Sequence, residues 1–213
     1  MELGGLKPEH TVLDVGCGIG RMAIPLTMYL TKGRYEGFDI VRRGIAWSTK
    51  IISAQYPNFR FQLADVYNRW YNPGGAYDAS DYKFPFSAGS FDFVFLTSVF
   101  THMLPRDFEN YLSEVARVMR KGSKALITFF LLNDESRSFV SQGRSRLPFS
   151  VQGKGYTTIS EAKPESAVAY EEARVAEVLA QNGLEILHPI RYGSWCGRSK
   201  YLSYQDILVV TKH

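Results

Sequence analysis

Thr11-Val-Leu-Asp-Val-Gly-Cys-Gly-Ile-Gly-Arg21 is the stretch that decides the fold of this chain. Its first residues have strand character and run directly into glycines at positions 16, 18 and 20, after which an amphipathic helix pattern begins. A strand that breaks into closely spaced glycines before a helix presents bare backbone N–H groups at the positive end of the helix dipole. Glycine suits this place because a Cβ atom would hold a ligand away from the backbone. The stretch therefore predicts a nucleotide-like cofactor site in an α/β sheet.

Length and composition are those of an ordinary globular protein. The chain has 213 residues, of which 45% are hydrophobic and 22% are charged, and this suits one domain with a complete core. No apolar run could span a bilayer, and no secretory signal begins the chain. Cys17 and Cys196 lack metal-ligand spacing, and the place of Cys17 in the glycine loop disfavours a structural disulfide. We therefore expect a single domain over 1–213 in the reducing cytoplasm, with no metal site and no membrane contact.

The net charge of +4 raises the question of an acidic or nucleic-acid partner. Lysine and arginine are spread along the chain, and only residues 137–154 hold a denser group of arginines and a lysine between aromatic residues. Dispersed charge is typical of a solvated surface, so a nucleic-acid partner stays open but is not favoured. The sequence does not indicate the oligomeric state.

Strand and helix patterns alternate along the chain, which predicts a parallel sheet with helices on both faces. The predicted strands are 11–15, 34–39, 59–64, 91–97, 124–132, 184–190 and 206–211. The predicted helices are 21–30, 45–55, 105–119 and 164–181, and Arg120-Lys121-Gly122 reads as a positive, glycine-capped helix end. The last two strands would pair as a hairpin and add an antiparallel edge. The predicted fold is thus doubly wound, with a mostly parallel seven-stranded sheet and an antiparallel final strand.

Two stretches lack a regular pattern. Residues 66–90 are rich in Tyr, Asn, Gly and Pro, and residues 133–163 are polar with Ser, Arg and Gly throughout. Loops of this length within a compact domain are usually functional. We therefore expect both insertions to form the substrate side of the domain.

Three aspartates accompany three successive predicted strands. Asp14 lies just before the glycines, Asp39 ends the second strand and Asp65 ends the third. Ligands of open parallel sheets bind at the carboxyl ends of the strands, so Asp39 is placed to accept hydrogen bonds from two ribose hydroxyls. Asp65 and its neighbour Val66 are placed to meet an adenine. Each aspartate alone could equally be a helix cap or turn residue, but three in register with a glycine loop favour a site.

The glycine spacing separates two kinds of cofactor. A dinucleotide fingerprint is Gly-x-Gly-x-x-Gly, but here the third glycine, Gly20, comes one residue early and Arg21 follows it. A Gly-x-Gly-x-Gly loop preceded by aspartate is better suited to a ligand without phosphates, whose amino-acid end rests on the loop. The spacing therefore disfavours a nicotinamide oxidoreductase on a similar sheet.

These motifs resemble the class I S-adenosylmethionine-dependent methyltransferases. Leu13–Gly20 looks like the first motif of that family, Asp39 matches its ribose-binding acid, and Leu63–Tyr67 resembles its adenine segment. Ser90–Met103 resembles the fourth-strand motif, and Val115–Gly122 resembles the turn after the following helix. The resemblance covers the chain from about residue 10 to its end.

The resemblance implies a cofactor site for S-adenosylmethionine, with S-adenosylhomocysteine as product. The glycines would lie against the methionine moiety and ribose, Asp14 would order the loop and the cofactor amino group, and Thr97 would offer its carbonyl to that group. Arg21 pairs with the cofactor carboxylate or is a solvated residue of the first turn. The implied cofactor-binding residues are Asp14, Gly16, Cys17, Gly18, Gly20, Arg21, Asp39, Ile40, Asp65, Val66, Tyr67 and Thr97.

Family members usually carry at least one helix before the first strand, and only residues 1–10 stand there in this sequence. The sequence leaves three alternatives open: a trimmed chain, a naturally small one, or one whose lid comes from a partner.

The acceptor side is less specified by the sequence. His102, just past the fourth strand, is the candidate general base for a poorly acidic hydroxyl, and its alternative role is that of a structural histidine at a helix start. Aromatic residues and one arginine in the irregular stretches, the last helix and the final loop are the acceptor candidates: Tyr71, His102, Arg144, Tyr156, Tyr170 and Trp195.

The leading interpretation is an enzyme that moves a methyl group from S-adenosylmethionine to an oxygen of a small molecule by in-line displacement. The alternatives are a non-catalytic protein that binds S-adenosylmethionine and a methyltransferase acting on RNA or protein.

Overall fold

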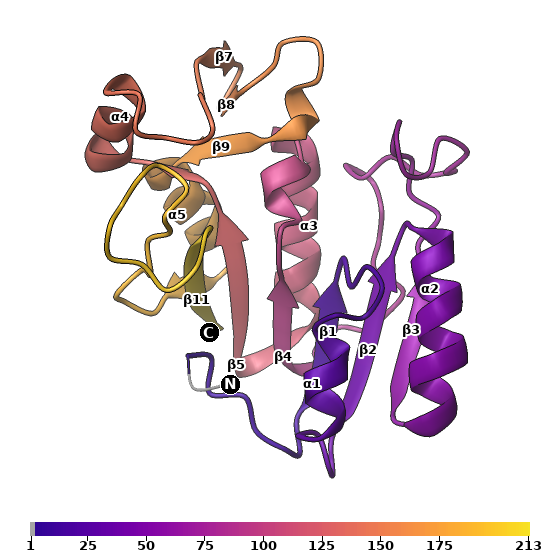
Figure 1. Ribbon diagram of the computed structural model, residues 1–213. Helices are drawn as coiled ribbons and strands as arrows, with labels where there is room; N and C mark the ends of the chain where they lie inside the picture. Colours follow the sequence, from indigo (N-terminus) through magenta and orange to yellow (C-terminus); the bar gives the residue numbers. More distant parts are fainter. Residues whose placement is uncertain (1–2) are drawn as a thin grey trace.

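The computed structural model describes residues 3–213 and places a seven-stranded sheet at the centre of the molecule (Figure 1). The strands lie in the order β10-β11-β5-β4-β1-β2-β3. β1 to β5 are parallel, β11 runs antiparallel to β5, and β10 runs antiparallel to β11. Their bounds are Thr11–Val15 (β1), Arg34–Asp39 (β2), Phe59–Leu63 (β3), Phe91–Leu96 (β4), Met119–Phe129 (β5), Leu184–Ile186 (β10) and Asp206–Lys212 (β11). The predicted fold class is confirmed.

Helices cover both faces of this sheet because side chains alternate along each strand. On β1, Val12 packs with α1 and α2, whereas Leu13 belongs to the core under α3 and α5. The helices are α1 (Ala23–Thr27), α2 (Arg42–Ser48, continued by a π-helical turn over Thr49–Ser53), α3 (Pro105–Val118) and α5 (Glu172–Gln181). Strands that are buried on both faces consist mostly of apolar residues, which explains why Asp92 is the one polar residue of β4.

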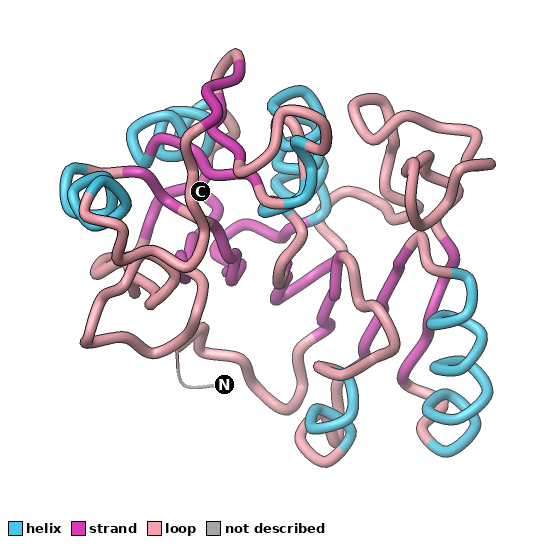
Figure 2. The backbone as a smooth tube through the Cα atoms, turned by 45° about the horizontal axis from the view of Figure 1, so that its top comes forward, coloured by secondary structure: helices cyan, strands magenta, loops and turns pink. Residues whose placement is uncertain are grey.

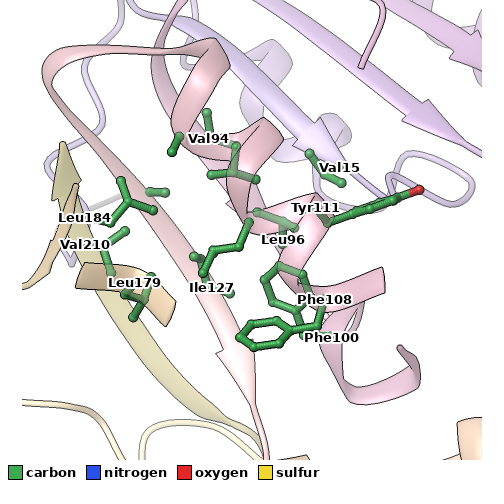
Figure 3. Close-up of a cluster of buried hydrophobic side chains, with 14 of the residues drawn as sticks. Val15, Val94, Leu96, Phe100, Phe108, Tyr111, Ile127, Leu179, Leu184 and Val210 are labelled. Carbon is green, nitrogen blue, oxygen red and sulfur yellow. The ribbon is translucent and has the colours of Figure 1, made fainter. Parts of the chain in front are cut away.

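The larger core lies between the sheet and α3 and α5 (Figure 3). Val15, Leu96 and Ile127 from the central strands meet Phe108 of α3 and Leu179 of α5, and all five are nearly inaccessible to solvent. Interiors packed in this way have low compressibility. The core therefore fixes the carboxyl ends of β1 and β4, where the candidate site lies.

A second, small sheet stands beyond the carboxyl ends of the large one (Figure 1). Its order is β6-β9-β8-β7, with bounds Leu131–Leu132 (β6), Val168–Glu171 (β9), Tyr156–Thr158 (β8) and Val151–Gly153 (β7). The stretch 133–163 is therefore not irregular throughout, since it also contains α4 (Asp134–Ser141). Asn133 starts this helix because its side chain accepts a hydrogen bond from the Ser136 backbone N–H at 3.0 Å.

The predicted helix over 164–181 is wrong in its first half. Pro164–Ser166 is a single 3₁₀ turn, Val168–Glu171 is β9, and only Glu172–Gln181 is helical. The apolar residues of β9 are buried because they pair with β6 on one side and β8 on the other. Tertiary pairing here outweighs a periodicity that suits a helix equally well.

Other boundaries differ for local reasons. α1 is five residues long instead of ten, and Pro25 in it has no N–H to donate. Arg120-Lys121-Gly122 does not cap α3, because Met119 already begins β5. The register between β4 and β5 shifts from the Phe91–Met119 pair to the Phe93–Lys124 pair, so the residues between Met119 and Lys124 bulge out of the ladder.

The chain reverses its direction of travel across the sheet after β3. It moves outward from β1 through β2 to β3 and returns to place β4 on the other side of β1. The switch point of the sheet thus lies between β1 and β4, and open α/β sheets bind ligands there. Residues 66–90 connect β3 to β4 with neither helix nor full strand (Figure 2). Within residues 3–213, no helix has both the length and the apolar character that crossing a membrane requires.

Candidate active site

A cavity of about 400 Å³ opens at this switch point. It is walled by the ends of β1, β2 and β4, by the segment after β3 and by the start of α3. Among the residues implied by the sequence, the following line it: Gly16, Gly18, Arg21, Asp39, Ile40, Val66, Tyr67, Tyr71, Thr97 and His102. These ten residues come from four separate segments of the sequence and meet in one cavity.

Asp39 holds the glycine loop to the end of β2. Its Oδ2 accepts a hydrogen bond from the Gly18 N–H at 2.7 Å, and its Oδ1 accepts one from the Val41 N–H at 2.8 Å. The Gly16 and Cys17 N–H groups both donate to the Phe38 carbonyl, at 2.9 and 3.1 Å. A carboxylate has about four acceptor sites, so each oxygen of Asp39 can accept one more hydrogen bond from a ligand hydroxyl.

The three glycines of the loop serve different purposes. At Gly18, φ is +57° and a Cβ atom would meet nothing within 4 Å, so its bare face is open to a ligand. At Gly16, φ is +76° and a Cβ atom would lie 2.6 Å from Cγ2 of Val99, so close packing also requires glycine. Gly20 does not line the cavity, since its Cβ position lies 2.8 Å from Cδ1 of Ile52 in the π-helical turn. Packing against this turn is thus a structural reason for glycine at position 20, and a contact of Gly20 with a cofactor stays a prediction.

The segment after β3 supplies an apolar and aromatic wall. Val66, Tyr67 and Tyr71 line the cavity as expected, together with Asn68. The exposed side chain of Asp65 does not line it, and its carbonyl instead accepts hydrogen bonds from two later N–H groups of the loop. Asp65, which follows β3, thus closes a turn, and its carboxylate does not line the cavity where we expect an adenine.

The loop after β4 contains a strained residue that sequence reasoning missed. Ser98 has φ of +61° and is the one residue other than glycine with positive φ among residues 3–213. Two bonds hold it: its N–H donates to Oγ1 of Thr128 at 2.8 Å, and its Oγ donates to Oε1 of Gln205 at 3.0 Å. Strained backbone of this kind clusters at ligand sites. Nothing local in the sequence signals it, because both partners are distant in the sequence, Thr128 in β5 and Gln205 just before β11.

His102 ends a 3₁₀ turn over Phe100–His102 and lines the cavity. Its Nδ1 lies 2.9 Å from the carbonyl oxygen of Glu165. A carbonyl can only accept, so Nδ1 carries the proton of the neutral ring and Nε2 keeps its lone pair. The side chain therefore has the tautomer that a general base requires.

Three lining residues from α3 and the 3₁₀ turn after β8 were also missed: Asp107, Tyr111 and Glu165. Burial raises the pKa of Asp107, aided by the charge of Glu165 and opposed by backbone hydrogen bonds from Leu104 and Ser80. Burial likewise raises the pKa of the Tyr111 hydroxyl. No sequence signal could locate Glu165, since residues 164–166 were expected to be part of a long helix.

The comparisons with known proteins agree with this geometry. The model of the family described as "Methyltransferase domain" matches residues 12–122, just over half of the chain. The chain belongs to this family. Its sheet and glycine loop are those of a class I S-adenosylmethionine-dependent methyltransferase, so the family, the fold and the cofactor expected from the sequence are confirmed.

Several curated proteins have sequences similar to this chain. A phthiotriol/phenolphthiotriol dimycocerosates methyltransferase of Mycobacterium ulcerans is 32% identical over 130 residues, which are 60% of this chain and 39% of that protein. The chain thus spans about two fifths of the length of the curated relatives it matches.

Solved structures share the fold at low sequence identity. Magnesium protoporphyrin IX methyltransferase from Synechocystis is 18% identical with a TM-score of 0.61, covering 100% of this chain and 78% of that one. The 1,6-didemethyltoxoflavin-N1-methyltransferase of Burkholderia thailandensis is 16% identical with a TM-score of 0.61. The match covers 96% of this chain and 71% of that one.

Four of the proposed acceptor residues do not line this cavity. Trp195 is fully buried and donates its Nε1–H to Asp206 at 2.7 Å, so it is a core residue. Tyr170 is buried and donates its hydroxyl to the Met103 carbonyl at 2.7 Å. Arg144 stacks on the Phe139 ring and bonds the Gly197 carbonyl. Aromatic residues and arginine are suited to an acceptor site, but these three side chains make contacts with residues that are distant in the sequence. Tyr156, in β8, packs against the large core and does not line the cavity either.

The side chains of Asp14 and Cys17 are buried beneath the backbone of the glycine loop. Neither lines the cavity, and both belong to the side of the sheet that α1 and α2 cover. Asp14 accepts a hydrogen bond from the Tyr35 hydroxyl at 2.5 Å, and its other oxygen has no partner among residues 3–213. Burial raises the pKa of Asp14 to about 7, against the lowering effect of the Tyr35 bond, and the charge of Asp39 adds to the rise. Asp14 can therefore order the loop only from below.

The raised pKa of Asp14 predicts a pH-dependent stability. Between its ordinary value of 3.8 and about 7, the folded state binds a proton that the unfolded state has lost. The free energy of unfolding should therefore fall as the pH rises through this window, by up to about 1.4 kcal/mol per pH unit from this group. Asp14→Asn should remove this slope, which urea unfolding at pH 4.5, 6 and 7.5 would measure. The exposed Asp81→Asn is the control and should keep it. If the free energy of unfolding changed with pH in the same way for wild type and Asp14→Asn, the raised pKa would not belong to Asp14.

Proposed function

We propose that this methyltransferase transfers a methyl group from S-adenosylmethionine to a hydroxyl oxygen of a small molecule. The single observation that carries the choice of oxygen is the Nδ1 contact of His102 with the Glu165 carbonyl, at 2.9 Å in the cavity wall. A general base is needed where the acceptor is a poorly acidic hydroxyl. The two free, buried cysteines suit a reducing cytoplasm, which is part of the proposal.

The residues of the cavity fit the cofactor. Asp39 has acceptor capacity left for the ribose hydroxyls, the open face of Gly18 admits the amino-acid end, and Val66 and Tyr67 offer a flat apolar wall to the adenine. Thr97 and Arg21 line the part of the cavity where the amino and carboxylate groups would lie. When bound, S-adenosylmethionine supplies a methyl group that its sulfonium already activates.

The protein would contribute alignment and proton removal. His102 would accept the acceptor's proton at Nε2 while Nδ1–H stays bonded to Glu165, so the imidazolium that forms keeps its orientation. Tyr71 and Met103, which also line the cavity, would align the acceptor and exclude water. A small acceptor is supported by the printed names of the relatives, which refer to small molecules and lipids.

Label transfer tests this proposal. The protein is incubated with S-adenosylmethionine carrying a tritiated methyl group and with matched panels of phenols, amines, RNA and protein. We expect label in the phenol panel, at a site that resists the conditions that cleave methyl esters. Label found only on amines, RNA or protein would contradict the proposal, and binding of S-adenosylhomocysteine without any transfer would favour a non-catalytic role.

Asp39→Ala should weaken the binding of S-adenosylhomocysteine. The change removes the ribose acceptors and the two hydrogen bonds that hold the Gly18 and Val41 N–H groups. Hydrogen bonds to a charged group contribute about 1.5–3 kcal/mol, so the Kd should rise at least tenfold in calorimetric titration. Asp65→Ala is the matched control, because its carboxylate does not line the cavity, and its Kd should stay within threefold of wild type. Equal Kd values for both variants would contradict the ribose assignment.

A further inference from the structure

A second hollow adjoins the cofactor cavity and is not needed to hold the cofactor. It has a volume of about 600 Å³ and lies along the first turn of α3. Asp107 lines both hollows, and the consecutive residues Met103 and Leu104 line the cavity and the second hollow respectively. The two hollows are therefore neighbours at the start of α3, with Asp107 at their boundary. We call the second one the α3 groove.

The middle of the α3 groove is apolar. Leu104 and Pro105 line it, together with Tyr170, whose hydroxyl is occupied by the Met103 carbonyl at 2.7 Å. Its charged pair, Glu109 and Arg174, is joined at 2.5 Å and therefore largely neutralised. This wall suits a hydrocarbon stem, because it offers a ligand few unpaired polar groups.

Two cations in the α3 groove remain without a carboxylate. Arg106, on α3, and Lys154, at the tip of the β7–β8 hairpin, are exposed and have no ion-pair partner among residues 3–213. The hairpin tip sits close to α3, since the Cβ position of Gly155 lies 3.7 Å from Cγ of Pro105. An insertion of the fold thus brings a second cation to the groove, and together they suit an anionic group.

We propose that the α3 groove binds the distal part of the acceptor, and that this part is an apolar stem ending in a carboxylate. The proposal rests on the proposed function, since the acceptor's hydroxyl would reach His102 while its stem crosses Asp107 into the groove. Arg106 and Lys154 would pair with the carboxylate, and Leu104 with Pro105 would contact the stem. The acceptor class is then an elongated hydroxy acid.

Octanoate and octan-1-ol are matched probes, because they share a stem and differ in charge. Each is titrated calorimetrically into the full chain saturated with S-adenosylhomocysteine. We expect saturable octanoate binding to wild type. The double variant Arg106→Glu/Lys154→Glu should raise the octanoate Kd at least tenfold and change the octan-1-ol Kd less than twofold. Lys121→Glu/Lys124→Glu, at the opposite edge of the sheet, carries the same charge change and should bind octanoate as wild type does.

The outcomes separate this proposal from the proposed function. Two results would overturn the groove assignment alone. The first is wild type that binds S-adenosylhomocysteine but not octanoate. The second is an equal loss of octanoate affinity in the two double variants. Failure of wild type to bind S-adenosylhomocysteine would overturn the proposed function. In that case, titration of octanoate into the protein without S-adenosylhomocysteine would still test the groove. Unchanged thermal midpoints and unchanged S-adenosylhomocysteine affinity show that the variants are folded.

Discussion

His102→Gln should lower kcat about 10²- to 10⁴-fold, the range that a positioned general base contributes. Glutamine keeps a polar side chain of similar reach but cannot take a proton. The contact of Nδ1 with the Glu165 carbonyl holds the ring, so Nε2 is the nitrogen that would take the proton. The affinity for S-adenosylhomocysteine should stay within threefold of wild type, because the cofactor residues are untouched.

The control for this prediction is His188→Gln. His188 is exposed and lines a separate hollow near the chain terminus, so its loss should leave kcat within twofold. Single-turnover assays of both variants against wild type would measure the chemical step itself. Similar rates for all three proteins would show that the acceptor needs no base, and would make the His102–Glu165 contact a structural link only.

Asp206→Ala should lower the free energy of unfolding by about 3–5 kcal/mol. The buried carboxylate accepts three hydrogen bonds, from the Leu131 and Gly193 N–H groups at 2.7 and 2.6 Å and from Nε1 of Trp195 at 2.7 Å, and it pairs with Arg198 at 3.4 Å. Alanine would leave these buried donors without an acceptor, and each would bear its own desolvation cost. Burial raises the pKa of Asp206, and the same bonds oppose that rise.

Urea unfolding measures this loss, with Asp134→Ala as control. Asp134 is exposed in the first turn of α4, so its removal should cost less than about 1 kcal/mol. Asp206→Ala should also weaken S-adenosylhomocysteine binding, because the adjacent Gln205 holds Ser98 in its strained conformation. A loss below 1 kcal/mol for Asp206→Ala would contradict the role of this carboxylate as the anchor of the loop that follows β10.

Local sequence patterns were sufficient to predict the part of the site that is built from backbone groups. The strand, the glycines and Asp39 could be predicted because β1, the loop and β2 are neighbours in both sequence and space. The apolar run of β4 and the amphipathic face of α3 were equally clear, since burial on two faces or on one leaves a distinct pattern. Asp65 shows the limit: position at a strand end was predicted, but the direction of its side chain was not.

Residues 131–206 mark the part that local patterns could not resolve. Residues 167–171 have a pattern that suits either a helix or a strand, and pairing with β6 and β8 decides between them. Trp195 and Tyr170 have the types expected of acceptor residues, yet both satisfy buried partners far away in the sequence. Only the three-dimensional arrangement shows such partners.

The sequence by itself determined the family, the parallel direction of the central strands and the cofactor edge of the sheet. It did so because a bare glycine loop after β1 and a carboxylate after β2 are local requirements of backbone geometry and hydrogen bonding. Tertiary structure alone decided which residues stand on the acceptor side. Glu165 meets His102, and Lys154 meets the start of α3, because a second sheet built from distant segments packs over the first, and contacts of that range leave no periodic trace in the chain.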